Sequence, residues 1–522
     1  MSRPAAVIVL AAGEGTRMKS QLPKVLHELC GRSMLGHVIA MARELDPQRL
    51  IVVVGHGRDL VTGHLTEHAP EVVAVVQERT GGTGHAVRTV IDAVGVIDGT
   101  VLVTYADTPL LRATTLAGLA DEHAQAGNAV TVLTARLQDP TGYGRIVRDA
   151  SGVLTEIVEE RDATAGQRAI TEINSGVYAF NGSLLADAAK RVSTANAKGE
   201  EYLTDVVAIL RGDGHAAGTM LATDAAEVEG VNDRAQLARA RKRYNERLIT
   251  HWMLAGVTIV DPATTWIDVG VTLEPDSEIW PGTHLAGRTA VGAGARIGPD
   301  CVLTDTTVAE EARVTHAVCE SAQIGPRASV GPFAYLRPGT CLGPSAKAGS
   351  YVELKNAVVG EGSKVPHLSY VGDAEIGEHS NIGAATVFVN YDGVNKNRST
   401  VGDHVRVGSD TMVVAPVQIG DGAYTAAGSV ITQDVPPGAL GVARAKQRNV
   451  QGWVARQRPG TPAARAAEAA VRGESGSGGA GRDDAGDGGR GESGGGGTGH
   501  GEVTGGGTGR GDVGRTDEET GA

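Results

Sequence analysis

The segment LAAGEGTRMKSQLPK, residues 10–24, combines the residue types that bind an anion. Gly13 and Gly15 let backbone N–H groups approach a ligand closely, and basic side chains follow on the same loop. The cations on or just beyond the loop are Arg17, Lys19 and Lys24. The predicted ligand is therefore anionic, with a phosphate as the natural choice.

This loop is neither of the two common phosphate-binding loops. Met18 stands where a P-loop needs its second glycine, and it also stands where the dinucleotide-binding fingerprint needs its third. The preceding run AAVIVLAAG is typical of a buried parallel strand. The sequence therefore predicts a buried strand followed by a glycine-rich basic loop that fits neither of these two patterns.

Three further polar residues stand out by position. Asp107 ends the strand-like run TVLVTYAD, at the edge where open α/β sheets bind ligands. Asn232 follows in EGVND, and His367 in SKVPHLSY. Taken singly, each has an ordinary explanation, because such residues also cap helices, form turns or serve structure.

The first part of the chain, residues 1–232, is predicted to be an α/β domain. Apolar runs alternate with helical stretches such as TTLAGLADEHAQAG, which is typical of a mostly parallel sheet covered by helices. The strand-like runs are AAVIVLAA, RLIVVVG, VVAVVQE, TVLVTYAD and AVTVLTA. Residues 233–256 then have no Gly or Pro before their end and read as one linker helix.

Residues 257–457 follow a six-residue period. From Ile324 the chain reads IGPRAS, VGPFAY, LRPGTC, LGPSAK, and an aliphatic residue leads nearly every six. Hexapeptide repeats of this kind predict a parallel β-helix with the leading residues in its core. The phase slips by one near Val359 and Ile376, and residues 388–400 are predicted to form a projecting loop.

Composition limits the remaining possibilities. The 522 residues carry a formal charge of -13, which argues against a nucleic-acid surface. No apolar run is long enough to cross a membrane, no signal-peptide pattern is present, and the cysteines show no C-x-x-C pairing, so a reducing cytoplasm is expected. Residues 458–522 are rich in Gly and charged residues and are predicted to be a disordered tail. The cysteines are Cys30, Cys301, Cys319 and Cys341.

Roughly residues 5–451 closely resemble a bacterial family, the bifunctional N-acetylglucosamine-1-phosphate uridylyltransferases/glucosamine-1-phosphate N-acetyltransferases. The matching motifs are GEGTRM, GTGHA, YADTPL, PTGYGRI, IVEERDAT, EINSGVYAF, EVEGVNDR, RPGT, VELKNA, HLSYVGDAEIG, NIGAATVFVNYDG and VGSDTMVVAPV. The resemblance implies a Rossmann-like nucleotidyltransferase domain followed by a left-handed β-helix that forms homotrimers. It also implies synthesis of UDP-N-acetylglucosamine, a precursor of the cell envelope.

The resemblance implies a uridylyl-transfer site in the first domain. UMP would pass from UTP to N-acetylglucosamine 1-phosphate, with Mg²⁺ on Asp107 and Asn232 and release of pyrophosphate; a second metal ion stays open. No covalent enzyme intermediate is implied. The residues matched to UTP and the UDP-sugar are Leu10, Ala11, Ala12, Gly13, Arg17, Lys24, Gln77, Gly82, Thr83, Gly144, Glu159, Asn174 and Asn232.

A second site, for acetyl transfer from acetyl-coenzyme A to glucosamine 1-phosphate, is implied in the β-helix. His367 would be the base, and Glu353 is expected to orient it. The residues matched to the amino sugar are Arg337, Lys355, Tyr370, Asn381 and Lys396. Those matched to acetyl-coenzyme A are Ala384, Asn390, Tyr391, Ser409, Ala427 and Arg444. Neighbouring subunits would share this site.

Three other functions compete with this interpretation. One is a monofunctional sugar-nucleotide pyrophosphorylase with a structural β-helix, which the motifs between His367 and Tyr391 disfavour. Another is a zinc hydratase, for which His367, His379 and His404 lack a repeating spacing. A non-catalytic scaffold leaves the Asp107 and Lys24 motifs unexplained.

Overall fold

A computed structural model describes residues 3–474 of the chain. The described residues divide into two compact units, residues 3–444 and 445–474. The first unit holds the α/β domain, a long helix and the β-helix. None of the helices in the described part of the chain is long and apolar enough to cross a lipid bilayer.

The α/β domain is built on a nine-stranded sheet whose main path runs β11-β7-β10-β6-β1-β4-β5. Strand β1 pairs in parallel with β4 and β6, whereas β10 runs antiparallel to β6 and β7. The sheet is thus mostly parallel, as the alternating pattern predicts. Its strands are β1 (Ala6–Leu10), β4 (Leu50–Val54), β5 (Val73–Val76), β6 (Thr100–Tyr105), β7 (Val130–Arg136), β8 (Arg145–Arg148), β9 (Leu154–Val158), β10 (Glu172–Asn181) and β11 (Ala217–Leu221).

Helices cover both faces of this sheet because successive residues of a strand point to opposite sides. In β1, Val7 and Val9 pack into one apolar cluster with Leu35 of α1, and Ile8 packs into the other with Val87 of α3. The helices are α1 (Met34–Arg43), α2 (Arg58–His68), α3 (Thr83–Val94), α4 (Ala113–Ala126), α5 (Ala165–Arg168), α6 (Gly182–Ala189) and α7 (Asp205–Gly212). Shorter elements are η1 (Thr16–Met18), η2 (Lys24–Leu26), β2 (Glu28–Leu29), β3 (Arg32–Ser33) and η3 (Ala225–Val228).

Helix α8 (Arg234–Leu254) spans the predicted linker segment. Asp233 caps its first turn by accepting a hydrogen bond from the Gln236 N–H at 2.7 Å. Its start packs Leu237 against the α/β domain, and Ile249 near its end joins the core of the β-helix. The helix therefore belongs to the packing of both domains.

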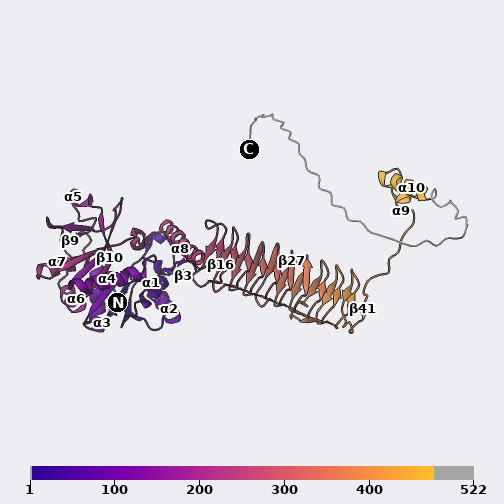
Figure 1. Cartoon of the computed structure of the whole chain (residues 1–522), viewed down its shortest axis with the longest axis horizontal. Helices are drawn as coiled ribbons and strands as arrows, with labels where there is room; N and C mark the ends of the chain where they lie inside the picture. The colour runs from indigo at the N-terminus through magenta and orange to yellow at the C-terminus, as the bar shows by residue number, and fades with distance from the viewer. Residues whose placement is uncertain (1–2, 475–522) are drawn as a thin grey trace, which may run out of the picture. The chain divides into compact units, whose positions relative to one another are not determined.

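The β-helix stacks three parallel sheets, coil upon coil, from β16 past β27 to β41 (Figure 1). The first sheet contains β12 (Thr258–Ile259), β15 (Glu278–Ile279), β18 (Arg296–Ile297), β21 (Arg313–Val314), β24 (Ser329–Val330), β27 (Lys347–Ser350), β30 (Lys364–His367), β33 (Asn381–Ile382), β36 (Arg406–Val407), β39 (Tyr424–Thr425) and β41 (Leu440–Gly441). The second contains β13 (Trp266–Ile267), β16 (His284–Ala286), β19 (Val302–Thr304), β22 (Ala317–Glu320), β25 (Ala334–Leu336), β28 (Glu353–Lys355), β31 (Tyr370–Gly372), β34 (Val387–Val389), β37 (Met412–Val414) and β40 (Val430–Ile431). The third contains β14 (Thr272–Leu273), β17 (Ala290–Val291), β20 (Thr307–Val308), β23 (Gln323–Ile324), β26 (Cys341–Leu342), β29 (Val358–Val359), β32 (Ala374–Ile376), β35 (Ser399–Val401) and β38 (Gln418–Ile419).

The leading residues of the hexapeptides point inward and are buried. Leu342, Val359 and Ile376 stack in register in the third sheet. Each step between them is one residue shorter than three full hexapeptides, and this missing residue is the predicted slip in phase. The predicted loop begins too early, however, because Phe388 is buried in β34 as a core residue and Thr400 lies in β35. An aromatic side chain fills the inward position there, so the projecting segment is residues 390–398.

The second unit contains α9 (Trp453–Gln457) and α10 (Pro462–Glu474). Helix α10 corrects the prediction that disorder begins at residue 458. Thr461 caps it by accepting a hydrogen bond from the Ala464 N–H at 3.2 Å, and Pro462 occupies its first turn. The sequence PAARAAEAAVRGE is rich in strong helix formers, which explains the difference. The rest of the predicted tail, from residue 475, lies outside the described residues.

Candidate active sites

A cavity of 350 Å³ opens in the α/β domain beside the ends of β1 and β6. The apolar and glycine residues after β1 form one wall, and Asp107 lies on the wall after β6. Ten residues matched by resemblance line it: Leu10, Ala11, Ala12, Gly13, Lys24, Gln77, Gly82, Thr83, Asp107 and Glu159. The carboxyl ends of parallel strands are where open α/β sheets bind ligands.

The glycine-rich loop brings Lys24 into this cavity. Gly15 adopts a left-handed conformation with φ of 63°, and a Cβ added there would lie 2.5 Å from the Cβ of Lys24. Glycine is thus required for both the turn and the close approach. The loop folds back on Lys24, while Gly13 has open space where a ligand would contact its backbone.

Lys24 joins the two residues expected to hold the metal. Its ammonium forms an ion pair with the Asp107 carboxylate and lies 3.4 Å from the amide oxygen of Asn232. Arg17 donates to the same Asn232 oxygen at 2.9 Å. The Val231 N–H donates to the Asp107 carbonyl at 2.8 Å, which holds Asn232 beside the end of β6.

Gly144, Glu159 and Asn174 meet at the other side of the cavity. The Asn174 N–H donates to the Gly144 carbonyl at 2.8 Å, and a Cβ on Gly144 would lie 3.5 Å from the Glu159 carboxylate. Burial raises the pKa of Glu159, and the approach of Lys198 and Thr204 opposes this only in part. A half-buried carboxylate at this position suits binding to sugar hydroxyl groups.

In the β-helix, Asp373 bonds to Lys355, one of the residues matched to the amino sugar, and to Asn390, one of those matched to acetyl-coenzyme A. Its carboxylate accepts from Asn356 at 2.8 Å and from Asn390 at 2.5 Å, and Lys355 pairs with it at 3.5 Å. A hydrogen bond with Lys355 and the like charge of that residue lower the pKa of Lys396. Two facing cations favour binding of a phosphate between them.

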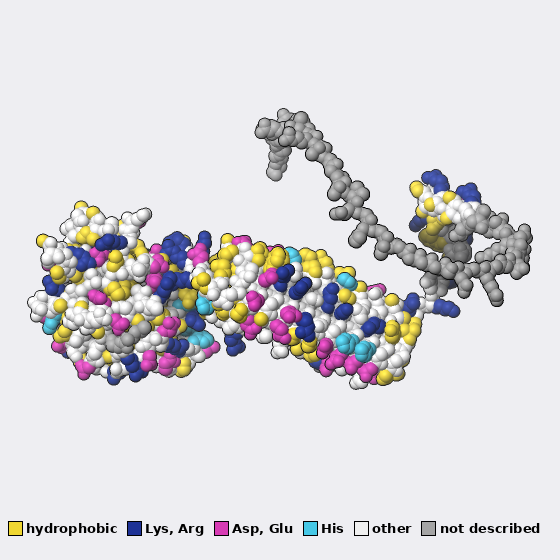
Figure 2. All heavy atoms as spheres, in the orientation of Figure 1, with side chains coloured by type: hydrophobic (Ala, Val, Ile, Leu, Met, Phe, Trp, Pro, Cys, Tyr) yellow, Lys and Arg dark blue, Asp and Glu magenta, His cyan; other side chains and the backbone are white. Residues whose placement is uncertain are grey.

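The face of the β-helix seen in Figure 2 carries charged side chains of both signs. Arg337, one of the residues matched to the amino sugar, pairs with Glu353 at 2.9 Å. In the single chain the Glu353 carboxylate pairs with Arg337, and no hydrogen bond joins it to His367 among the described residues, so its expected role in orienting His367 stays a prediction. Asn381 lies on the neighbouring sheet, in β33, apart from the strands that carry Arg337 and Lys355.

His367 lies at one corner of the β-helix, with the coenzyme A residues stacked on the coils beyond it. Its carbonyl accepts from Ala385 at 3.2 Å, the Ala384 carbonyl accepts from Asp410 at 2.7 Å, and the Ser409 carbonyl accepts from Gly428 at 2.9 Å. A Cβ on Gly428 would lie 3.8 Å from the Arg444 side chain. Thus Ala384, Ser409, Ala427 and Arg444 follow one edge that starts at His367.

The imidazole of His367 is exposed and has no hydrogen-bond partner among residues 3–474. The other two histidines weighed for zinc lie elsewhere: His379 and His404 stack at 5.3 Å between ring centroids, on a different corner. The described residues hold no group of three or more His, Cys, Asp or Glu side chains arranged for a metal ion. Tyr391, in the projecting segment, is exposed and bonds to the Gly393 carbonyl at 2.7 Å.

Family models match both the α/β domain and the β-helix. Residues 7–175 match the MobA-like NTP transferase domain, and residues 398–433 match the bacterial transferase hexapeptide model of six repeats. The bifunctional protein GlmU of Streptomyces avermitilis is 63% identical over 476 residues, which cover 91% of this chain and 99% of the relative. The chain belongs to the bifunctional GlmU family. Its Thermobifida fusca member is 61% identical over 473 residues (90% and 98%), and that of Corynebacterium glutamicum strain R is 54% identical over 469 residues (89% and 97%).

Membership of the GlmU family gives the chain two transferase activities in UDP-N-acetylglucosamine synthesis, uridylyl transfer and acetyl transfer. The monofunctional alternative is set aside, because the relatives match over nearly their whole length and carry the bifunctional name.

Several cavity residues escaped the sequence reasoning. Tyr105, Thr80, Lys198, Glu200 and Tyr202 also line the 350 Å³ cavity. Tyr105 is the last residue of β6 and precedes Asp107 by two residues. Its position in the sequence was therefore a signal that it lines the same cavity. The other residues lie on loops whose approach depends on tertiary packing.

Asp373 was missed in the second site although a signal was present. The step along the chain from Asn356 to Asp373 equals the step from Asp373 to Asn390, and it matches the length of one coil here. Polar residues at that spacing stack on adjacent coils, so a search for polar residues repeating once per coil would have found the cluster.

Proposed function

We propose that the α/β domain transfers UMP from UTP to N-acetylglucosamine 1-phosphate in the 350 Å³ cavity. The observation that carries this assignment is the position of Lys24, whose ammonium contacts both Asp107 and Asn232. A cation set between two oxygen donors at a glycine-rich loop is suited to a polyphosphate and its metal ion.

Different residues of the cavity would bind the base, the sugar and the phosphates of the two substrates. Gln77 and Gly82 would hold the base at one side, and Glu159 with Asn174 would hold the sugar at the other. The phosphates then lie between them, beside Lys24. This order brings the sugar phosphate oxygen toward the α-phosphate of UTP.

Asp107 and Asn232 fit a magnesium ion. They offer one carboxylate and one amide oxygen, which are hard donors, and Mg²⁺ sites of this type are completed by substrate phosphates and water. When bound, the ion would neutralise charge on the reacting phosphates. Lys24 and Arg17 would pair with the remaining phosphate oxygens, and Lys24 is held on Asp107 until then.

The reaction itself needs no covalent bond to the protein. A phosphate oxygen of the sugar forms a bond to the α-phosphorus of UTP, and the bond from that phosphorus to the bridging oxygen of pyrophosphate breaks. The chain would contribute position and positive charge, which are the main requirements of phosphoryl and nucleotidyl transfer.

In the β-helix, His367 would act as the general base for acetyl transfer. The amine of glucosamine 1-phosphate forms a bond to the acetyl carbon and its proton passes to His367. The carbon–sulfur bond breaks, and coenzyme A leaves as a thiolate that takes up a proton to become the free thiol. Lys355 and Lys396 would hold the phosphate, and Asn390, fixed by Asp373, would lie near the amine.

We propose that this second site is completed in a homotrimer. In the single chain His367 is exposed, and acetyl transfer requires a site that excludes water and donates hydrogen bonds to the oxyanion. A neighbouring subunit packed against this corner would supply the missing wall.

Pyrophosphate release against Mg²⁺ concentration tests the first site. Asp107→Asn should lower the rate by roughly 100-fold and shift the dependence to higher Mg²⁺. The control is Asp46→Asn, which removes an exposed carboxylate whose only partner in the described part of the chain is Arg3. A normal Mg²⁺ dependence in Asp107→Asn would contradict the assignment.

A further inference from the structure

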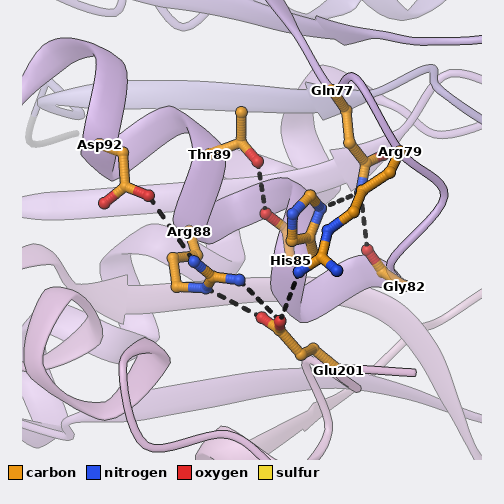
Figure 3. A network of polar contacts seen from close by, with 8 residues as sticks. All are labelled: Gln77, Arg79, Gly82, His85, Arg88, Thr89, Asp92 and Glu201. Carbon is orange, nitrogen blue, oxygen red and sulfur yellow. Dashed lines mark hydrogen bonds and ion pairs between the residues drawn. The ribbon is translucent and has the colours of Figure 1, made fainter. Parts of the chain in front are cut away.

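Gln77, which directly follows β5, bonds through its amide nitrogen to two residues at the start of helix α3 (Figure 3). This nitrogen lies 3.2 Å from the carbonyl oxygen of Gly82 and 2.8 Å from Nδ1 of His85. A carbonyl oxygen can only accept, so the Gly82 carbonyl identifies that end of the amide as the NH₂ group.

It follows that His85 must accept at Nδ1. The second hydrogen of the Gln77 amide points to this ring nitrogen, so the imidazole is neutral and carries its proton on Nε2. Both hydrogens of the Gln77 amide are then used. Its oxygen has no partner among the described residues, and the residue lines the cavity.

The surroundings hold His85 in this position. Arg88, on the same helix, forms a bidentate ion pair with Glu201 at 2.6 and 2.9 Å. The Gly84 N–H donates to the Glu201 carbonyl at 2.8 Å, which ties α3 to the segment that carries Tyr202. A Cβ on Gly81 would lie 2.7 Å from Cγ of His85, so only glycine lets the ring pack against this loop.

Burial, helped by two nearby cations, keeps the ring neutral. Burial lowers the pKa of His85, and the positive charges of Arg88 and Arg79 lower it further. Glu201 and Asp92 act in the opposite direction but do not outweigh burial. A protonated ring would present a donor to the Gln77 NH₂ group and favour the flipped orientation of the amide, in which its oxygen faces the ring.

We propose that His85 is a positioning residue that fixes the Gln77 amide so that the cavity selects uracil over cytosine. The proposal rests on the proposed function, in which the base lies beside Gln77. Uracil presents an N–H at position 3 and a carbonyl at position 4, whereas cytosine presents an acceptor and an amino group. The Gln77 oxygen would accept from the uracil N–H, and the Gly82 N–H, which has no acceptor among the described residues, would donate to the carbonyl.

The test is the ratio of kcat/KM for UTP to that for CTP, with N-acetylglucosamine 1-phosphate and Mg²⁺, in the full chain. His85→Leu and His85→Gln both remove the acceptor at the Nδ1 position, whereas His85→Asn places an amide oxygen near it. The ratio should fall about tenfold in His85→Leu and His85→Gln, and His85→Asn should restore most of it.

His123→Leu is the matched control, since His123 is also buried and bonds through Nδ1, to Thr131 at 3.1 Å, but does not line the cavity. Its ratio should equal that of the wild type. An unchanged ratio in both His85→Leu and His85→Gln, or an equal fall in His123→Leu, would overturn the role of His85. A wild type that uses UTP and CTP equally would instead overturn the base site of the proposed function.

Discussion

The ammonium of Lys24 forms an ion pair with the carboxylate of Asp107, which joins the loop after β1 to the end of β6. Both side chains are largely shielded, with 12% and 18% of their surface exposed. A pair so placed keeps two opposite charges ready for a ligand that separates them. Triphosphate would take the cation, and a metal ion would take the carboxylate.

Replacing Lys24 by Met should abolish most uridylyl transfer. The change removes the cavity-lining cation that pairs with Asp107, and loss of one such group costs roughly 100-fold or more in kcat. Lys19→Met is the control, because Lys19 lies on the same loop but is exposed and outside the cavity. Steady-state pyrophosphate release distinguishes them, and equal losses would mean that the loop needs positive charge in general.

Asp373→Asn should weaken binding of glucosamine 1-phosphate. Although burial opposes ionisation, hydrogen bonds from Asn356 and Asn390 and the charge of Lys355 lower the pKa of Asp373. Loss of the charge would release Lys355 and Asn390, and we expect KM to rise about tenfold. Glu375→Gln, two residues along and 60% exposed, should leave KM unchanged. If both variants behave alike in thiol-release assays, Asp373 does not organise the site.

Gly349→Ala should damage the acetyl-transfer site through the backbone. An added Cβ would lie 2.0 Å from the carbonyl oxygen of Pro366, the residue before His367, so the strand must move. The expected cost is about 1–3 kcal/mol of stability together with loss of thiol release. Gly63→Ala, in the open on α2, provides the control: it should keep thiol release and raise stability slightly, because Ala favours a helix over Gly by about 1 kcal/mol. Normal thiol release in Gly349→Ala would show that the coil adapts.

The α/β domain should lose stability as the pH falls below neutral, partly through His37. Burial lowers the pKa of His37 to about 4, against a hydrogen bond to the Leu29 carbonyl that works the other way. Between pH 6.5 and about 4 the unfolded chain binds a proton that the folded chain does not, so the free energy of unfolding rises with pH. One such group contributes roughly 3 kcal/mol over this window.

His37→Gln isolates this contribution, because Gln keeps an N–H for the Leu29 carbonyl but does not titrate. Urea unfolding followed by far-ultraviolet circular dichroism, at several pH values, should show a smaller loss at acid pH in the variant. Identical pH profiles for the two proteins would exclude His37 as a source of the acid sensitivity.

The sequence predicted the architecture well where one residue type repeats. Buried β-branched runs fixed β1, β4 and β6, and aliphatic leads such as Leu342 and Val359 marked the coils. The hexapeptide pattern misplaced the start of the projecting loop at Phe388. It expects an aliphatic residue at the inward position, and an aromatic residue takes that position here.

Side-chain pairing was harder to predict than the fold. The glycine-rich loop and Asp107 line one cavity, whereas the pairing of Glu353 with Arg337 was not expected from the sequence. The two partners of an ion pair depend on how adjacent coils stack, and motifs read along the chain do not contain that information. Helix α10 was missed for another reason. The prediction of disorder rested on the composition of the whole tail, in which the many glycines after residue 474 obscure the short alanine-rich segment that forms α10.

The central claim is that two separate sites on one chain perform the two reactions. The most direct test follows free thiol and pyrophosphate together, in the wild type, His367→Ala and Asp107→Asn. His367→Ala should lose thiol release from glucosamine 1-phosphate and acetyl-coenzyme A while it keeps pyrophosphate release from UTP and N-acetylglucosamine 1-phosphate, and Asp107→Asn should show the reverse. Loss of both products in either variant, or a wild type that releases pyrophosphate without thiol, would contradict the account.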